Sequence, residues 1–235
     1  MKYKALILSL FVAIPSQASD IKTSHKGYSV KIGSSRIIYK EKSKGASVIV
    51  VNPEDYPVLI QSTVYGEDKS SPGSFIVTPP IFRLEAQVTS RLKLIRKGNE
   101  LPQDKESMEW LCIKGIPPVD STNDDSVDGA AEVIVQISMN TCNKILYRPS
   151  GLQGEMIDFA GEVRWKRNGE SIVGINNSPY YINISELKVG GKEFFNPQYI
   201  KPFSEKSFGI RGAGVIEWKV ITDNGGESKL FRSGS

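Results

Sequence analysis

The stretch EVIVQISMNTCNKILYRP, residues 132–149, collects the side-chain types that could do chemistry in this chain. Apolar side chains stand at every second position, in the row Val133, Val135, Ile137 and Met139. The reactive or charged side chains that follow are Cys142, Lys144 and Arg148. The apolar row can be buried against other apolar side chains, and the cysteine can form a disulfide. A lysine or arginine taken alone is usually a solvated surface charge.

A two-residue period places the apolar row on one face of a β-strand, because successive side chains point to opposite faces. One interpretation is an ordinary core strand. A strand from Val133 to Tyr147 would, however, span roughly 50 Å at about 3.3 Å per residue, and ordinary strands have about 3 to 10 residues. The length favours a strand that lies partly outside its own core.

The other residue types argue against an enzyme. His25 is the only histidine, which removes His-based triads and most zinc or copper sites. No GxSxG, P-loop or GxGxxG sequence is present. The 26 acidic residues offer many pairs, so the sequence leaves open the possibility of a catalytic pair of carboxylates. We expect no enzymatic activity, no cofactor and no metal.

The first 18 residues are typical of a secretory signal. Lys2 and Lys4 precede an apolar run over 5–14, and Ser16-Gln17-Ala18 suits cleavage after Ala18. No later segment approaches the roughly 20 apolar residues of a membrane span, so we expect an exported protein without membrane insertion. The formal net charge of +4 falls by two with the signal, which is too weak a bias to predict nucleic-acid binding.

The two cysteines, Cys112 and Cys142, allow one disulfide in an exported chain. The alternative is a pair of free buried thiols. Closing a loop of about 30 residues would contribute roughly 3 to 4 kcal/mol to stability in the chain-entropy model.

Strand-like runs separated by turn sequences such as PED, SSPG, RNGE and DNGG recur along the whole chain, with almost no helical periodicity. This pattern predicts an all-β protein of two immunoglobulin-like β-sandwich domains. We expect a signal peptide over 1–18, an N-terminal domain over 19–149 and a C-terminal domain over 150–235. The acidic segment 117–129 is expected to be a loop that opens onto the long strand.

Six motifs in order resemble one family: GSSRIIY (33–39), FIVTPPIFRLE (75–85), DKESMEWLCIKGIPP (104–118), NKILYRP (143–149), NNSPYYI (176–182) and ITDNGG (221–226). Together they resemble the PapD-like periplasmic chaperones of the chaperone-usher pathway. The acidic loop flanked by the cysteines is similar to the subfamily with a long loop between strands F and G. The resemblance covers nearly all of the chain after the signal.

The resemblance implies a function for the apolar row. Family members complete the unfinished immunoglobulin fold of a fibre subunit with their own strand and deliver the subunit to an outer-membrane usher. The implied donor residues are Val133, Val135, Ile137 and Met139, which would fill pockets of the subunit by strand addition. Arg36 and Lys144 are implied to bind the subunit's C-terminal carboxylate in a cleft between the two domains, which lie at an angle.

Three more expectations concern neighbouring residues. The resemblance places Arg148 in a buried ionic network with Glu106 and Asp223. Because the donor residues have odd numbers and Lys144 an even one, we expect a bulge or twist between Asn140 and Asn143. The stretch 21–32 could supply a second donor strand, in which Tyr28, Val30 and Ile32 alternate.

The competing hypothesis is a secreted immunoglobulin-like binding module, either an adhesin or a fibre component. The two-domain layout, the acidic loop and the paired Arg36 and Lys144 argue against it. An exposed apolar edge also predicts self-association of the free protein, since unpaired strand edges associate readily.

Overall fold

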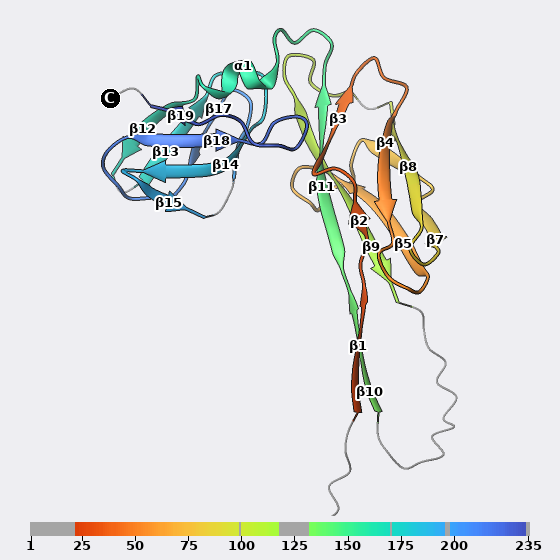
Figure 1. The fold of residues 1–235 in the computed structure, drawn as a ribbon. Helices are drawn as coiled ribbons and strands as arrows, with labels where there is room; N and C mark the ends of the chain where they lie inside the picture. The colour runs from red at the N-terminus through yellow and green to blue at the C-terminus, as the bar shows by residue number, and fades with distance from the viewer. Residues whose placement is uncertain (1–21, 99, 118–131, 170, 196–197, 234–235) are drawn as a thin grey trace, which may run out of the picture.

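The computed structural model describes residues 22–98, 100–117, 132–169, 171–195 and 198–233. Two β-sandwiches lie at an angle to one another, so that the molecule has the shape of a bent arm (Figure 1). One apolar core uses residues between 28 and 147, and the other uses residues between 156 and 220. The all-β, two-sandwich prediction is confirmed. The signal segment 1–18 and most of the acidic loop lie outside the described residues.

The N-terminal sandwich packs a five-stranded sheet, in the order β3-β11-β9-β5-β7, against a four-stranded sheet, β2-β4-β8-β6. Alternation builds its core: β5 buries Val58, Ile60 and Val64 on one face and exposes Leu59 and Gln61 on the other. The described strands of this half are β1 (Lys22–Tyr28), β2 (Lys31–Ile32), β3 (Arg36–Lys40), β4 (Ala46–Val51), β5 (Val58–Tyr65), β6 (Phe75–Thr78), β7 (Ile81–Leu84), β8 (Thr89–Arg96), β9 (Ser107–Ile116), β10 (Glu132–Ser138) and β11 (Asn140–Arg148).

The C-terminal sandwich is built around the buried Trp218, whose Nε1 donates to the Ala160 carbonyl oxygen at 2.9 Å. Its elements are α1 (Met156–Ala160), β12 (Arg164–Asn168), β13 (Ser171–Asn176), β14 (Ile182–Val189), β15 (Lys192–Phe194), β16 (Tyr199–Ile200), β17 (Ser204–Ser207), β18 (Ile216–Val220) and β19 (Phe231–Arg232). One sheet has the order β12-β13-β17, and the other has β15-β14-β18-β19 with β16 paired to β14. No helix in the described ranges is long and apolar enough to cross a membrane.

The helix α1 was not predicted, because its five residues are too few to show a helical period. A capping box begins it: the Glu155 side chain accepts from the backbone of Asp158, and the Glu155 N–H donates to Asp158 Oδ2 at 2.8 Å. Met156 and Ala160 are buried in the C-terminal core. Tertiary burial therefore accounts for a helix that the local sequence does not reveal.

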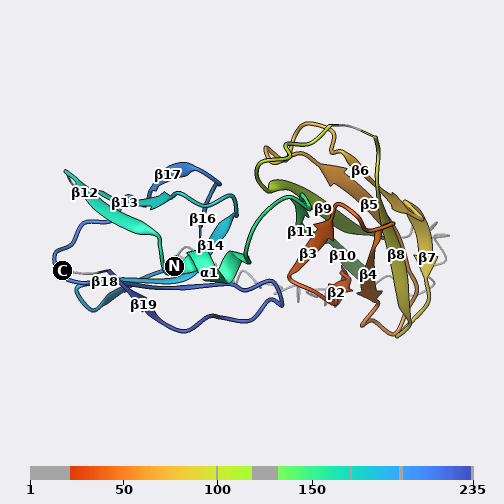
Figure 2. The ribbon, with the colours of Figure 1, turned by 90° about the horizontal axis from the view of Figure 1, so that it is seen from above.

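The two sandwiches meet through a small apolar cluster of their own. Met108 on β9 and Leu146 on β11 pack against Tyr181 from the C-terminal half, and all three are buried. Figure 2 shows the two halves side by side, with the connection that follows β11 leading into α1. This cluster holds the cleft-lining strands β9 and β11 against the start of β14.

The strands β10 and β1 form a two-stranded parallel ribbon that extends beyond the N-terminal sandwich (Figure 1). The register runs from Lys22 opposite Glu132 to Tyr28 opposite Ser138. The N-terminal stretch thus lies beside the proposed donor strand. Tyr28 and Val30 are nevertheless buried in the N-terminal core, so those side chains are wrong as candidates for a second donor row.

The bulge expected between Asn140 and Asn143 is wrong. β11 pairs with β9 without a register shift from Asn140 to Tyr147, and Cys142 lies directly opposite Cys112. A disulfide between directly opposed residues favours regular pairing at this point. The strand is interrupted earlier, at Met139, whose N–H donates to the Tyr28 carbonyl oxygen and whose own carbonyl accepts from the Gly115 N–H.

Candidate functional site: a basic cleft beside an exposed apolar strand

Arg36 lies where the two sandwiches meet, at the start of β3. The parallel register of β3 and β11 places Arg36 opposite Lys144. Arg36 is only 6% exposed; its Nη1 donates to the Ile221 carbonyl oxygen at 3.1 Å, and its Nε is buried without a hydrogen-bond partner. Burial lowers the pKa of Arg36, although the negative charges of Asp223 and Glu106 oppose that shift. A buried guanidinium with an unused donor can bind an anion.

Lys144 projects from β11 into the same cleft. Its Nζ donates to Asn183 Oδ1, lies 4.6 Å from the centre of the Tyr199 ring and lies 5.8 Å from the centre of the Trp110 ring. Burial, followed by the positive charges of Arg36 and Lys69, lowers the pKa of Lys144 to about 8. Within the described residues, neither Arg36 nor Lys144 forms an ion pair with a carboxylate. The pair therefore has the charge and donors to hold one carboxylate.

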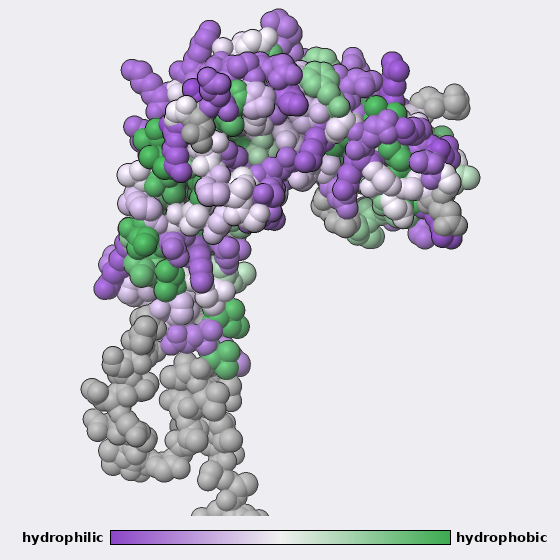
Figure 3. Space-filling view, turned by 180° about the vertical axis from the view of Figure 1, so that it is seen from behind, coloured by the Kyte–Doolittle hydropathy of each residue, from purple (hydrophilic) through white to green (hydrophobic). Residues whose placement is uncertain are grey.

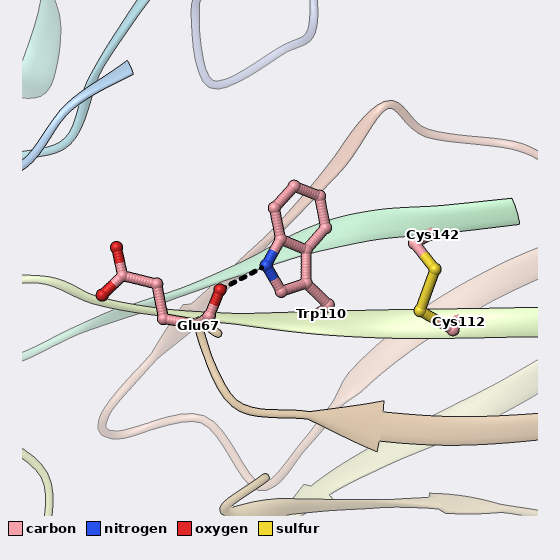
Figure 4. The surroundings of a disulfide bond; sticks show 4 residues. All are labelled: Glu67, Trp110, Cys112 and Cys142. Atoms are coloured by element: carbon pink, nitrogen blue, oxygen red, sulfur yellow. Dashed lines mark hydrogen bonds between the residues drawn. A yellow bond between two sulfur atoms is a disulfide. The ribbon is translucent and has the colours of Figure 1, made fainter. Parts of the chain in front are cut away.

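A disulfide joins the neighbouring strands β9 and β11 (Figure 4). Cys112 on β9 and Cys142 on β11 are bonded, with 4.0 Å between their Cα atoms, which confirms the predicted pairing. Two residues before Cys112, Trp110 donates from Nε1 to the Glu67 carbonyl oxygen at 3.1 Å. The Glu67 carboxylate contacts Lys201 of the C-terminal half at 3.0 Å, so the loop that carries Glu67 spans the cleft.

Arg148 joins the two sandwiches through charge. It contacts Glu106 at 2.6 Å and Asp223 at 2.6 Å, so the structure brings together all three residues of the expected network. The second oxygen of Glu106 accepts from the Tyr181 N–H at 2.8 Å. Burial raises the pKa of Glu106, and the charge of Arg148 opposes that effect. Burial by itself would lower the pKa of Arg148. The hydrogen bonds and negative charges of Asp223 and Glu106 outweigh burial, so the pKa of Arg148 is raised.

The apolar row lies on the strand that leads away from the cleft. Val135, Ile137 and Met139 are 37%, 51% and 51% exposed, whereas Ile145 and Tyr147 further along the chain are buried. Val133 lies on β10, and its side chain is outside the described residues. Figure 3 shows hydrophobic side chains on the surface of this projection, just above the atoms drawn in grey. β10 has β1 as its one strand neighbour in the described structure, so its other edge is open to a further strand.

Sequence reasoning missed the residues that surround the Lys144 ammonium. Asn183 and Tyr199 come from the C-terminal half, 39 residues or more beyond Lys144 in the chain, and no spacing rule relates them to it. Trp110 lies opposite Lys144 in the β9–β11 register, so knowledge of that pairing would have found it. No group of three or more His, Cys, Asp or Glu side chains in the described ranges could hold a metal ion.

Comparisons with known proteins agree with this architecture. A family model described as the N-terminal domain of the PapD pili and flagellar-assembly chaperone matches residues 29–153. A second model, described as the C-terminal domain of the pili assembly chaperone PapD, matches residues 158–232. The two models meet near the junction of the two sandwiches and together cover nearly all of the described chain.

Individual relatives are similar along their whole length. Chaperone protein AggD of Escherichia coli is 38% identical over 239 residues, which cover 98% of this chain and 95% of the relative. Chaperone protein caf1M of Yersinia pestis is 43% identical over 237 residues, covering 94% and 92%. The crystal structure of the E. coli chaperone DraB has a TM-score of 0.82 at 44% identity, covering 91% of this chain and 99% of that one.

One similar structure contains a bound partner. The Salmonella enterica SafA pilin in complex with the SafB chaperone matches with a TM-score of 0.84 at 40% identity, covering 92% of this chain and 100% of the matched chain. These comparisons confirm the resemblance stated from the six motifs and support the chaperone hypothesis over the binding-module alternative. The chain belongs to the PapD family of pilus-assembly chaperones, the periplasmic chaperones of chaperone-usher systems.

Proposed function

We propose that this chaperone captures a fibre subunit in two linked steps, strand addition along β10 and binding of the subunit's C-terminal carboxylate by Arg36 and Lys144. The observation that carries the proposal is a pair of cations, one buried and one half-buried, without a carboxylate partner in the described structure, at the base of an exposed apolar strand. Charge in such a place is costly unless it is paired, so a bound carboxylate would stabilise the site.

The apolar row would supply the affinity that does not depend on charge. Complete burial of one such side chain contributes about 1.5 to 3 kcal/mol. Val135, Ile137 and Met139 are already partly covered, so covering their remaining 37%, 51% and 51% would contribute about 2 to 4 kcal/mol in total. Val133 would add to this as the outermost donor residue. Backbone hydrogen bonds along β10 would fix the direction of the added strand, and the anchored carboxylate would fix its register.

Anchoring and strand addition require the same partner, a fibre subunit with a free C-terminus and an immunoglobulin fold that lacks a strand. The SafA–SafB complex shows that a similar chaperone binds a pilin. The proposal includes export to the periplasm with cleavage after Ala18, and delivery of the subunit to an outer-membrane usher. Its chemistry is binding alone, so it assigns no catalytic residue and no cofactor.

Native mass spectrometry of the chaperone purified from the periplasm of its own host tests the proposal. We expect the mass of residues 19–235 less two hydrogens, together with one small partner in a one-to-one ratio. Ile137→Asp should abolish the complex, because it places a charge in a subunit pocket, while Ile81→Asp on the exposed face of β7 should retain it. A bare monomer isolated from cells that assemble the surface fibre would contradict the proposal.

A further inference from the structure

A cavity of about 220 Å³ lies in the C-terminal sandwich, between β14 and the chain that follows β15 and β17. Six of the eight residues that line it are aliphatic or aromatic, and none of the eight carries a charge. Because burying a charge without a partner is far more costly than burying a neutral group, this lining favours a neutral ligand. The apolar residues are Ile184, Leu187, Phe194, Phe195, Phe208 and Ile210.

An interruption in strand pairing leaves room for the cavity. Beside β14, pairing with β15 ends at Phe194 and pairing with β16 begins at Tyr199. On the other edge of β14, pairing with β18 shifts register around Ser185, and such a bulge redirects the side chain of the extra residue. The N–H of Ile184 donates to the carbonyl oxygen of Gln198 at 2.9 Å, so Gln198 lies beside the step from Ile184 to Ser185.

Two polar atoms of the lining residues are buried without a hydrogen-bond partner. They are Oγ of Ser185 and Oε1 of Gln198. A buried polar atom without a partner is costly to the fold, and a ligand that forms a hydrogen bond with it removes that cost. A single hydroxyl group can donate to the amide oxygen of Gln198 and accept from the hydroxyl of Ser185. One neutral polar group on the ligand could therefore serve both residues.

The size and lining of the cavity suit an aromatic ring better than water. Each buried water takes about 30 Å³ and needs two to four polar partners, so the several waters that this volume could hold would have to share two side-chain atoms. A smaller cavity of about 150 Å³, lined by Leu, Ile and Phe, is sufficient to bind benzene. Phe195 is 86% exposed although it lines the cavity, so the cavity is accessible from solvent at this residue.

We propose that this cavity binds a neutral aromatic ring that carries one hydroxyl group, with the ring among the phenylalanines and the hydroxyl at Ser185 and Gln198. Small phenols and the side chain of a tyrosine share this chemistry. The pair Asn183 and Tyr199 separates the cavity from Lys144, which both side chains contact. The proposal does not depend on the anchoring of a carboxylate by Lys144.

Nuclear magnetic resonance titration of the purified, ¹⁵N-labelled chaperone tests the proposal. The probes are p-cresol and toluene, which differ only in the hydroxyl group. We expect both to shift the amide signals of Ser185 and Gln198, and p-cresol to bind roughly three- to tenfold more tightly, the range for neutral hydrogen bonds. A cavity without polar partners would prefer toluene, because burying an unpaired hydroxyl is unfavourable. A parallel titration with N-acetyl-tyrosinamide separates the two sources: binding similar to that of p-cresol assigns a tyrosine side chain, and binding of p-cresol alone assigns a free phenol.

Ser185→Ala combined with Gln198→Met removes both polar groups and should reverse the preference, so that toluene binds more tightly than p-cresol. Ser185→Ala alone should reduce the preference for p-cresol by roughly two- to threefold. Ser62→Ala is the matched control, because Ser62 Oγ is also buried without a partner but belongs to β5 of the N-terminal sandwich. It should keep the wild-type preference. An unchanged preference in the double variant, signal shifts confined to other residues, or no binding of either compound would overturn the proposal.

Discussion

Removing Arg148 should destabilise the folded chaperone far more than removing a surface arginine. Arg148→Met keeps much of the length of the side chain but leaves Glu106 without its cation, and the Glu106 side chain is 0% exposed. Breaking a buried pair from one side costs about 3 to 5 kcal/mol. For a chain of this size, about 2 to 4 °C of Tm per kcal/mol gives a fall of roughly 6 to 20 °C.

Urea unfolding followed by circular dichroism measures the change, and two further variants show its cause. Glu106→Gln combined with Arg148→Met should be more stable than Arg148→Met alone, because the orphaned charge is then absent. Arg83→Met removes an arginine whose side chain is 65% exposed and whose partner is Glu85, so it should cost at most about 1 kcal/mol. Additive losses in the double variant would refute the assignment of the cost to a buried, unpaired Glu106.

The pH dependence provides a second check on the same variant. Burial raises the pKa of Glu106 even in the presence of Arg148, so the loss of Arg148 should raise it further. The folded state would then bind a proton that the unfolded state releases, and stability rises as the pH falls through the folded pKa. The difference in stability between Arg148→Met and the wild type should therefore be largest at neutral pH and smaller near pH 4.5, where a solvent-exposed glutamate ordinarily titrates.

Arg36→Ala and Lys144→Ala should each abolish subunit capture in pull-down experiments while the far-ultraviolet circular dichroism spectrum stays that of a folded protein, and an unfolded variant would contradict the binding role. Because the pKa of Lys144 lies at about 8, subunit capture should weaken above that pH, and Lys144→Arg should remove this pH dependence. The same lowering of the pKa from 10.5 also affects the stability of the free protein. Between pH 8 and 10.5 the folded state holds fewer protons than the unfolded state, so the free energy of unfolding should increase as the pH rises. Replacing both Cys112 and Cys142 by serine should lower the free energy of unfolding by about 3 to 4 kcal/mol, as measured by urea unfolding, and a loss below about 1 kcal/mol would contradict a stabilising disulfide.

The alternation in the sequence was sufficient to predict the sandwiches, and the length of the strand indicated that the apolar row lies partly outside the core. Val135, Ile137 and Met139 could be recognised because a strand repeats every two residues and its length exceeded that of one core. The positions of Arg36, Glu106 and Asp223 came from the family resemblance. Arg148 and Asp223 lie 75 residues apart, and periodicity gives no information about such a contact.

What could not be predicted depends on tertiary contacts. We expected a bulge because the odd-numbered donor residues and the even-numbered Lys144 were assumed to share one face of the strand. The regular pairing of β11 instead puts odd and even residues on opposite faces. Leu146 faces the other domain, and Ile145 lies in the N-terminal core. The partners of Lys144 in the C-terminal half depend on how two separate chain segments approach one another. No local pattern encodes that approach.

The covalent link between β9 and β11 has a consequence for how freely the chain between them can vary. Because regular pairing and the disulfide at Cys112 and Cys142 fix both ends of that connection, its length is decoupled from the geometry of the cleft. Loop-closure entropy grows only with the logarithm of length, so doubling the 30-residue separation of the two cysteines would cost only about 0.6 kcal/mol. Insertions between β9 and β10, ahead of the donor strand, should therefore be tolerated, and that part of the connection is a suitable place to add a reporter sequence without disturbing Lys144.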